Sequence, residues 1–434
     1  LINTVAKPYQ ILALTFTNKA AREMQQRIAT IIPDPALTTQ LWMGTFHAIF
    51  ARILRIEAEK IGFPTNFSIY DAEDAKSMIE TIIKELQLPT DKYKTNVVSN
   101  RISQAKNNLL TPQAYSQHLE VRGNDEAAGL GKIADIYRIY AQRCLQAAAM
   151  DFDDLLLKTY ILLAKNADVL AKYQQKFKYL LIDEFQDTNP AQYAIVKLLA
   201  QQHRNICIVG DDAQSIYAFR GATIQNILNF ERDYPEMKTF KLEQNYRSTQ
   251  HIVQIANEVI AANSNQIAKQ IWTSNETGNK TRLLITSSDI EEAKLVADLI
   301  FEERLRNHYP NDNFAILYRT NSQSRLFEEA LRRRNIPYRV YGGMSFYQRK
   351  EVKDIMAYLR LIVNPNDEEA LRRIINYPTR GIGKTTTDKL AATARTSSCS
   401  LWEVVANVKQ TSLTTNTKEA VYSFYKMMRL FSDH

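Results

Sequence analysis

The chain contains, at residues 179–189, the stretch YLLIDEFQDTN, in which four apolar residues run directly into two acids. The apolar run is typical of a buried strand, and Asn189 followed by Pro190 is typical of a helix N-terminus. In open α/β sheets, ligands bind beyond the carboxyl ends of the strands. We therefore expect Asp183 and Glu184 to face a crevice that suits a hard cation such as Mg²⁺ and an attacking water. Two solvated acids at a strand end are the simpler alternative.

Two further apolar runs read as strands of the same sheet. ILALTF (11–16) precedes a helix pattern that Thr17 or Asn18 can cap, with Met24, Ile28, Ile31 and Ile32 on its apolar face. ICIV (206–209) ends at Gly210-Asp211-Asp212. Strands that alternate with helices predict an α/β fold with a parallel sheet.

The rest of the chain predicts a second α/β core and two helical segments. Residues 65–150 have long helical patterns, whereas from residue 240 short apolar runs return, at 240–242, 283–286, 314–319 and 338–342. From about residue 345 the pattern is helical again. The predicted domains are a first α/β core (1–65 and 150–240), a helical insertion (66–149), a second α/β core (241–344) and the start of an outer helical domain (345–434).

Composition narrows the class of protein. The 434 residues are 45% hydrophobic and 24% charged, which excludes a disordered tail, a collagen-like repeat and a disulfide miniprotein. A net charge of +8 fits an anionic partner such as nucleic acid, and it fits ordinary solubility equally well. The three cysteines show no zinc-ligand spacing, and no apolar run reaches about 18 residues. These features predict a soluble, cytoplasmic protein without a transition metal and without a membrane span.

Two motifs carry further chemistry. IVGDDAQSIYAFRGA (208–222) presents Gln214, whose carboxamide can sense a γ-phosphate, and then Tyr217, Phe219 and Arg220, which suit base stacking. The alternative is that the aromatic residues form the core of a loop. FKLEQNYRSTQHIV (240–253) places Arg247 where it could reach a γ-phosphate as an arginine finger in cis. A surface salt bridge is its alternative.

Six segments resemble, in order, the motifs of the UvrD/PcrA/Rep group of superfamily 1 DNA helicases. They are LALTFTNKAAREM (12–24), GTFHAIFARILR (44–55), LLIDEFQDTN (180–189), IVGDDAQSIYAFRGA (208–222), LEQNYRST (242–249) and AILYRTNSQSR (315–325). The resemblance implies two RecA-like P-loop NTPase-type motor domains with parallel sheets, each carrying a helical inserted domain. It also implies ATP between the motors, 3′ to 5′ translocation on single-stranded DNA, and unwinding at junctions of single- and double-stranded DNA.

The resemblance assigns roles to individual residues. Asp183 would hold Mg²⁺ through water, and Glu184 would be the general base for ATP hydrolysis. Gln214 would couple the γ-phosphate to the DNA, Tyr246 would stack on the adenine, and Arg247 would contact the γ-phosphate. The residues implied along the DNA path are Phe16, Asn18, His47, Tyr217, Phe219 and Arg220. Phe219 stands where relatives often have Trp.

One expected motif is missing. The sequence contains no GxxxxGK[ST] phosphate-binding loop, and RGIGKTT (380–386) matches only its tail, because Pro378 occupies the position of the upstream Gly. We therefore expect an internal fragment of a helicase, with motor cores incomplete at both ends and no ATP hydrolysis of its own. A nonmotor nucleic-acid-binding module and the motor part of a helicase-nuclease subunit are the alternatives.

Overall fold

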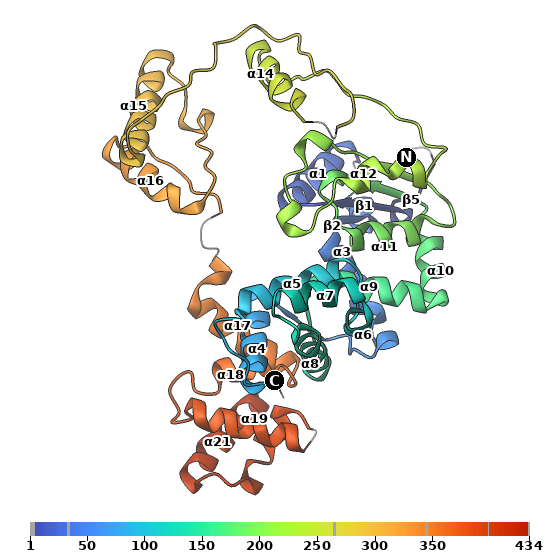
Figure 1. Ribbon diagram of the computed structural model, residues 1–434, viewed down its shortest axis with the longest axis vertical. Helices are drawn as coiled ribbons and strands as arrows, with labels where there is room; N and C mark the ends of the chain where they lie inside the picture. The colour runs from blue at the N-terminus through green and yellow to red at the C-terminus, as the bar shows by residue number, and fades with distance from the viewer. Residues whose placement is uncertain (1–4, 33–34, 264–265, 343–345, 398, 433–434) are drawn as a thin grey trace. The chain divides into compact units, whose positions relative to one another are not determined.

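The computed structural model describes residues 5–32, 35–263, 266–342, 346–397 and 399–432. The chain divides into two compact units (Figure 1). Unit 1 comprises Leu1–Phe240, Asn265–Ile267 and Met356–His434, and unit 2 comprises Lys241–Ser264 and Ala268–Ile355. The chain is an α/β protein with parallel sheets, as the sequence predicts.

A parallel four-stranded sheet forms the centre of unit 1. Its order is β2-β1-β5-β6, with β1 at Ile11–Thr15, β2 at Trp42–Thr45, β5 at Tyr179–Ile182 and β6 at Ile206–Ile208. Leu12 pairs with Trp42 on one side and with Leu180 on the other. The strands at 11, 179 and 206 are therefore confirmed. Strand β2 was not predicted, because its WMGT sequence lacks an apolar run.

Helices on both sides of the sheet enclose the main apolar core. Leu12, Phe50 and Leu180 have no exposed surface there. Thr17 caps α1, since its Oγ1 accepts a hydrogen bond from the Ala20 N–H at 3.1 Å, and Asn189 caps α11 in the same way. The helices of this part are α1 (Asn18–Ile31), α2 (Pro35–Gln40), α3 (Phe46–Glu57), α9 (Phe152–Lys165), α10 (Ala167–Lys176), α11 (Pro190–Ala200), α12 (Gln225–Leu228) and α13 (Phe230–Asp233).

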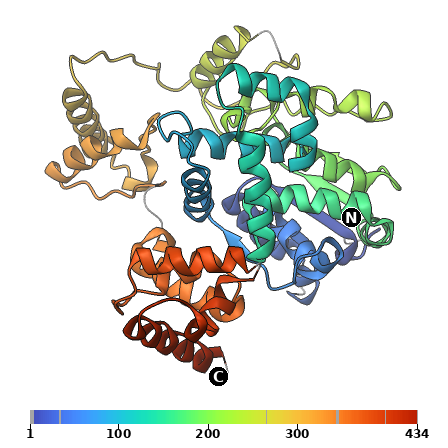
Figure 2. The same ribbon diagram turned by 60° about the horizontal axis from the view of Figure 1, so that its bottom comes forward.

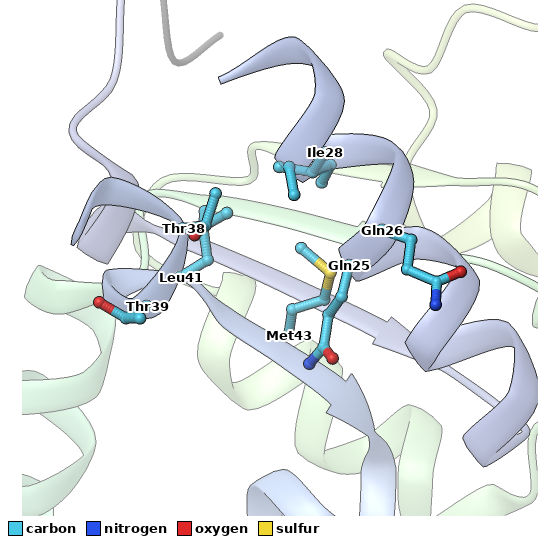
Figure 3. Close-up of a pocket in the computed structure, with 8 residues that line it drawn as sticks. Gln25, Gln26, Ile28, Thr38, Thr39, Leu41 and Met43 are labelled. Atoms are coloured by element: carbon cyan, nitrogen blue, oxygen red, sulfur yellow. The ribbon is translucent and has the colours of Figure 1, made fainter. Parts of the chain in front are cut away.

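The expected apolar face of α1 is only partly covered. Ile32 is buried, but Ile31 is 66% exposed, so its predicted inward packing is wrong. A hollow of about 400 Å³ lies between α1, α2 and β2, and Figure 3 shows its lining. Ile28, Leu41 and Met43 line it with apolar groups, beside glutamine and threonine side chains. Because its lining has no charged side chain, we do not regard this hollow as a catalytic site.

A helical segment with its own core lies between two short parallel strands, β3 (Ser68–Tyr70) and β4 (Ala149–Asp151). Its centre includes the fully buried rings of Tyr70, Tyr137 and Tyr140. The helices are α4 (Ala72–Glu85), α5 (Thr95–Asn107), α6 (Pro112–Gln117), α7 (Leu119–Ala127) and α8 (Ile133–Gln146). They occupy the stretch predicted to be helical, while its boundaries as a domain stay a prediction.

From Met356 onward the C-terminal helices belong to unit 1 and lie beside the helical segment (Figure 2), whereas the start of the first of them, Lys350–Ile355, belongs to unit 2. Asn364 donates hydrogen bonds to the carbonyl oxygens of Ala147 and Ala148, at 2.9 and 3.1 Å, and Arg360 pairs with Asp74. The helices are α17 (Lys350–Val363), α18 (Glu368–Ile374), α19 (Lys384–Thr396), α20 (Leu401–Ala406) and α21 (Thr415–Ser432). The predicted domain boundary at 344–345 lies outside the described residues.

Unit 2 contains α14 (Gln250–Ala261), α15 (Asp289–Asn307) and α16 (Ser324–Arg333), and its small core includes Ala297, Leu331 and Ile336. The strands expected at 240–242, 283–286, 314–319 and 338–342 are absent. Among the described residues of this unit, β pairing is limited to a bridge between Gln244 and Trp272. The prediction of these strands is wrong for this structure, because their backbone groups form no ladder with another described segment of the unit.

Candidate functional site

The acid pair follows β5 directly. The Asp183 N–H still bonds to the Leu14 carbonyl oxygen at 2.9 Å, so this residue continues the sheet, and Glu184 then leaves it. Glu184 has φ 53° and ψ 44°, a left-handed conformation that costs a non-glycine residue about 1 kcal/mol or more. The buried Phe185 ring packs edge-on against Tyr193 and Phe230 and anchors the loop behind it. The acids therefore lie at the carboxyl end of the sheet, as predicted.

A hydrogen bond from Gln186 holds the Glu184 carboxylate in place. The Gln186 side chain is 1% exposed, and its Nε2 donates to Glu184 Oε2 at 2.7 Å. Its Oε1 accepts the Asp211 N–H at 3.0 Å. A Cβ at Gly210 would lie 2.8 Å from that oxygen, so the glycine permits the close approach. One buried carboxamide thus joins the acid loop to the loop that follows β6, a link that sequence reasoning missed.

The electrostatics of the acid loop suit a cation. Burial raises the pKa of Asp183, and the nearby Glu184 raises it further. The same two causes raise the pKa of Asp187 to about 6. Carboxylates held at raised pKa gain from a nearby positive charge, and Mg²⁺ prefers one or two carboxylates with water and phosphate oxygens as its other ligands. The described residues contain no cluster of three or more metal-ligating side chains.

Gln214 lies on the loop that Gln186 holds. The short helix η4 (Asp212–Gln214) carries it, and its Nε2 donates to Asp211 Oδ2 at 2.7 Å. The same Asp211 supplies the backbone N–H that Gln186 accepts. The chain from Glu184 through Gln186 and Asp211 to Gln214 is therefore continuous in hydrogen bonds.

The predicted DNA-path residues all line one cavity of about 700 Å³. Phe16 and Tyr217 have ring centroids 4.7 Å apart, and Tyr217 and Phe219 are 5.8 Å apart. Arg220 lies over both rings of the second pair, at 5.4 and 5.5 Å from their centroids. The predicted residues that meet here are Phe16, Asn18, His47, Tyr217, Phe219 and Arg220. Their roles stay a prediction, while their proximity is a feature of the fold.

His47 lies at the start of α3 against Phe152, with ring centroids 5.9 Å apart. Burial lowers the pKa of its imidazole, so the ring is neutral at physiological pH. A neutral ring can stack on a base or accept a hydrogen bond, but it adds no charge for a phosphate.

Another wall of the cavity comes from α5 and its C-cap residue, in the helical segment. Asn100, Ser103, Gln104, Asn107 and Asn108 line it. Sequence reasoning missed these residues, because nothing in their local pattern separates them from any polar helix face.

Two buried side chains of α5 hold that wall in place. Lys106 is 1% exposed, and its Nζ lies 2.6 Å from Asp151 Oδ2 and 2.8 Å from Asp154 Oδ2. Burial alone would lower the pKa of Lys106, but the two carboxylates outweigh it and hold that pKa well above its usual value. Asn107 donates to Asp153 and accepts from Asn189, at 3.0 and 2.6 Å.

Tyr246 and Arg247 belong to unit 2. Asn245 Oδ1 accepts the Arg247 N–H at 2.9 Å, and the Tyr246 hydroxyl donates to Gln244 at 2.7 Å. Both side chains are exposed. They do not follow a strand as the motif predicts, since residues 240–242 form none, and their roles at the nucleotide stay a prediction.

The described helices contain no segment that is long and apolar enough to cross a membrane. The fold and the site define a parallel α/β protein in which one loop joins an acid pair at a strand end to an aromatic cavity. Residues 1–235 match the UvrD/REP helicase N-terminal domain, and residues 240–420 match the UvrD-like helicase C-terminal domain. The chain therefore belongs to the UvrD/REP helicase family, and its two UvrD-like domains agree with two RecA-like motor domains.

Curated relatives support the same family. Proteins named ATP-dependent DNA helicase PcrA from Staphylococcus epidermidis, Leuconostoc citreum and Staphylococcus aureus are 43%, 42% and 42% identical to the chain. Each alignment covers 97% of this chain and, respectively, 57%, 55% and 57% of the relative. The chain thus spans little more than half the length of these relatives.

Proposed function

We propose that a protein containing this chain is an ATP-dependent DNA helicase that moves 3′ to 5′ on single-stranded DNA and unwinds duplex at junctions. One observation carries the proposal: the loop 210–221 touches the acid pair through Gln186 at one end and lines the aromatic cavity at the other. A change at the nucleotide can therefore reach the strand through one short segment.

At the nucleotide, Glu184 is the proposed general base. It accepts a proton from the water that attacks the γ-phosphoryl group, and Gln186 keeps its carboxylate in place during that transfer. Asp183 is placed to hold Mg²⁺ through water. When bound, the cation offsets the negative charge of the phosphates. Gln214 senses the γ-phosphate, Tyr246 stacks on the adenine, and Arg247 contacts the γ-phosphate.

At the strand, the cavity binds through its rings and Arg220. Base stacking on aromatic side chains contributes roughly 1–3 kcal/mol per base and tolerates every base. Arg220 and the net charge of +8 attract the phosphates, so binding should weaken as salt rises. Strand affinity that did not depend on salt would contradict this assignment.

The chain of 434 residues contains no GxxxxGK[ST] motif. We propose that these residues alone bind strands without hydrolysing ATP, because backbone amides and a lysine for the β- and γ-phosphates are missing. Turnover by the purified chain would refute that part of the proposal.

The test is ATP hydrolysis by the protein of the complete native reading frame, with and without single-stranded DNA, beside its Glu184→Gln variant. We expect strand-stimulated turnover that the substitution abolishes, since the amide cannot take the proton. As the control, the Glu184→Gln variant must bind single-stranded DNA with the same affinity as the parent protein. Strand binding without any turnover in the parent protein would instead favour a nonmotor nucleic-acid-binding module.

A further inference from the structure

The wall of the cavity formed by α5 is a row of uncharged carboxamides. Asn100 and Gln104 are four residues apart on α5, so they share one face of the helix, and Asn108 follows as its C-cap residue. All three are exposed and line the cavity. Ser103 stands beside them. We call these three carboxamides the α5 row.

The two walls of the cavity are held close together. Gly221, at the end of the aromatic loop, has φ +84°, and a Cβ there would lie 3.8 Å from the Asn107 Cβ. Lys106 and Asn107 fix α5 to α9 and to Asn189 at the start of α11. The backbone that carries the α5 row is therefore fixed beside the aromatic loop, so binding would have to order only the exposed side chains.

The chemistry of the two walls differs. Tyr217, Phe219 and Arg220 offer ring faces and one positive charge, which serve base faces and phosphates. The α5 row has no charge to attract phosphate, yet Asn100 and Gln104 each carry two donors and an acceptor. The Asn108 amide already donates to the Gln104 carbonyl oxygen at 2.8 Å, which leaves it one donor and its acceptor. Asn and Gln side chains match the edges of bases, and adenine best, where the amide can bond in a bidentate manner.

We propose that the α5 row contacts the base edges of the single strand bound in this cavity and gives the protein a preference for adenine. This inference rests on the proposed function, since it assumes a strand in the cavity. The aromatic wall supplies affinity for any sequence, and the α5 row adds selection among sequences.

The test compares the full chain with its Asn100→Ala/Gln104→Ala double variant by fluorescence anisotropy. The probes are oligo(dA), oligo(dT) and a strand of the same length with central abasic sites. We expect the preference for oligo(dA) over oligo(dT) to fall about five- to tenfold in the variant. The slope of log affinity against log salt should stay unchanged, because no phosphate contact is lost.

Two further variants sharpen the test. Gln142→Ala removes an exposed carboxamide from α8, outside the cavity, and should keep the parent preference. Gln104→Lys should tighten binding to all three strands and steepen the salt slope, which shows that position 104 reaches the strand. Alanine is a good helix former, so circular dichroism should find each alanine variant folded.

The outcomes separate this inference from the proposed function. A parent chain that binds no strand would overturn both. If the parent chain binds a strand and the double variant keeps the parent's preference for oligo(dA), the proposed role of the α5 row is overturned. The proposed function would stand in that case. Equal weakening for all three strands, abasic included, would also overturn it, because the row would then be contacting the backbone.

Discussion

Leu180 and Leu317 lie in apolar runs that read alike as strands, yet Leu180 has no exposed surface and Leu317 is 94% exposed. Leu180 belongs to β5, which pairs with β1 and β6, whereas the segment 314–319 in unit 2 has no described strand beside it. The difference teaches that an apolar run becomes a strand only where neighbours pair with its backbone. Four matched pairs of substitutions test this contrast between the units.

The largest expected effect is on the buried ion pairs of unit 1. Lys106→Met leaves Asp151 and Asp154 buried without their cation, which should lower the free energy of unfolding by about 3–5 kcal/mol. The matched change in unit 2 is Arg334→Met, which removes a partly exposed pair with Asp298 and should lower the free energy of unfolding far less, because exposed ion pairs contribute little. Denaturant unfolding with hydrogen exchange resolved by unit measures both. Equal losses of unfolding free energy in the two variants would contradict the proposed difference between the units.

Replacing Leu180 and Leu317 by alanine tests how much each apolar side chain contributes to stability. Leu180→Ala should destabilise unit 1 by about 2–5 kcal/mol, because it opens a cavity in the core. Leu317→Ala should change stability by about 0.5 kcal/mol or less, as expected of an exposed side chain. If thermal unfolding showed a large loss for Leu317→Ala, the Leu317 side chain would be packed in solution.

Substitutions of two exposed phenylalanines should have different effects on the affinity for single-stranded DNA. Phe219 is 75% exposed and lines the cavity, so Phe219→Ala should weaken single-strand affinity by about 1–3 kcal/mol. Phe346 in unit 2 is also exposed, but it does not line this cavity, and Phe346→Ala should leave affinity near the parent value. Anisotropy titrations measure both, and a reversed ranking would place the strand elsewhere.

The smallest expected effect concerns pH. The pKa of Asp187 is raised to about 6, so native unit 1 binds more protons than the unfolded chain between about pH 4 and 6, and its stability falls as pH rises through that window. Asp187→Asn should remove that fall and stabilise the protein at pH 7 by about 1–2 kcal/mol.

The matched change in unit 2 has the opposite sign. The Arg334 side chain lowers the pKa of Asp298, so this group stabilises the native state at neutral pH, and that contribution is lost as pH falls through the lowered pKa. Asp298→Asn should therefore slightly destabilise unit 2 at pH 7. Melting temperatures from pH 4 to 8 test both signs, and an Asp187→Asn variant that melts lower at pH 7 would contradict the first.

Local sequence predicted the parts of the site that depend on neighbours in the chain. The end of β5 at Asp183, the caps at Thr17 and Asn189 and the clustering of Tyr217 with Phe219 follow from short motifs. The link through Gln186 could not be predicted, because it depends on Gly210 lying against a side chain 24 residues away along the chain.

The sequence by itself determined the class of this protein: a parallel α/β fold, an acid pair at a strand end, an aromatic motif with an arginine, and membership of one helicase family. Only the tertiary structure decided that α5 forms the second wall of the cavity and that the apolar runs of unit 2 stay unpaired. The physical reason is the same for both. Burial of Lys106 and pairing of a strand each need partners that are distant in the chain, and no local pattern specifies them.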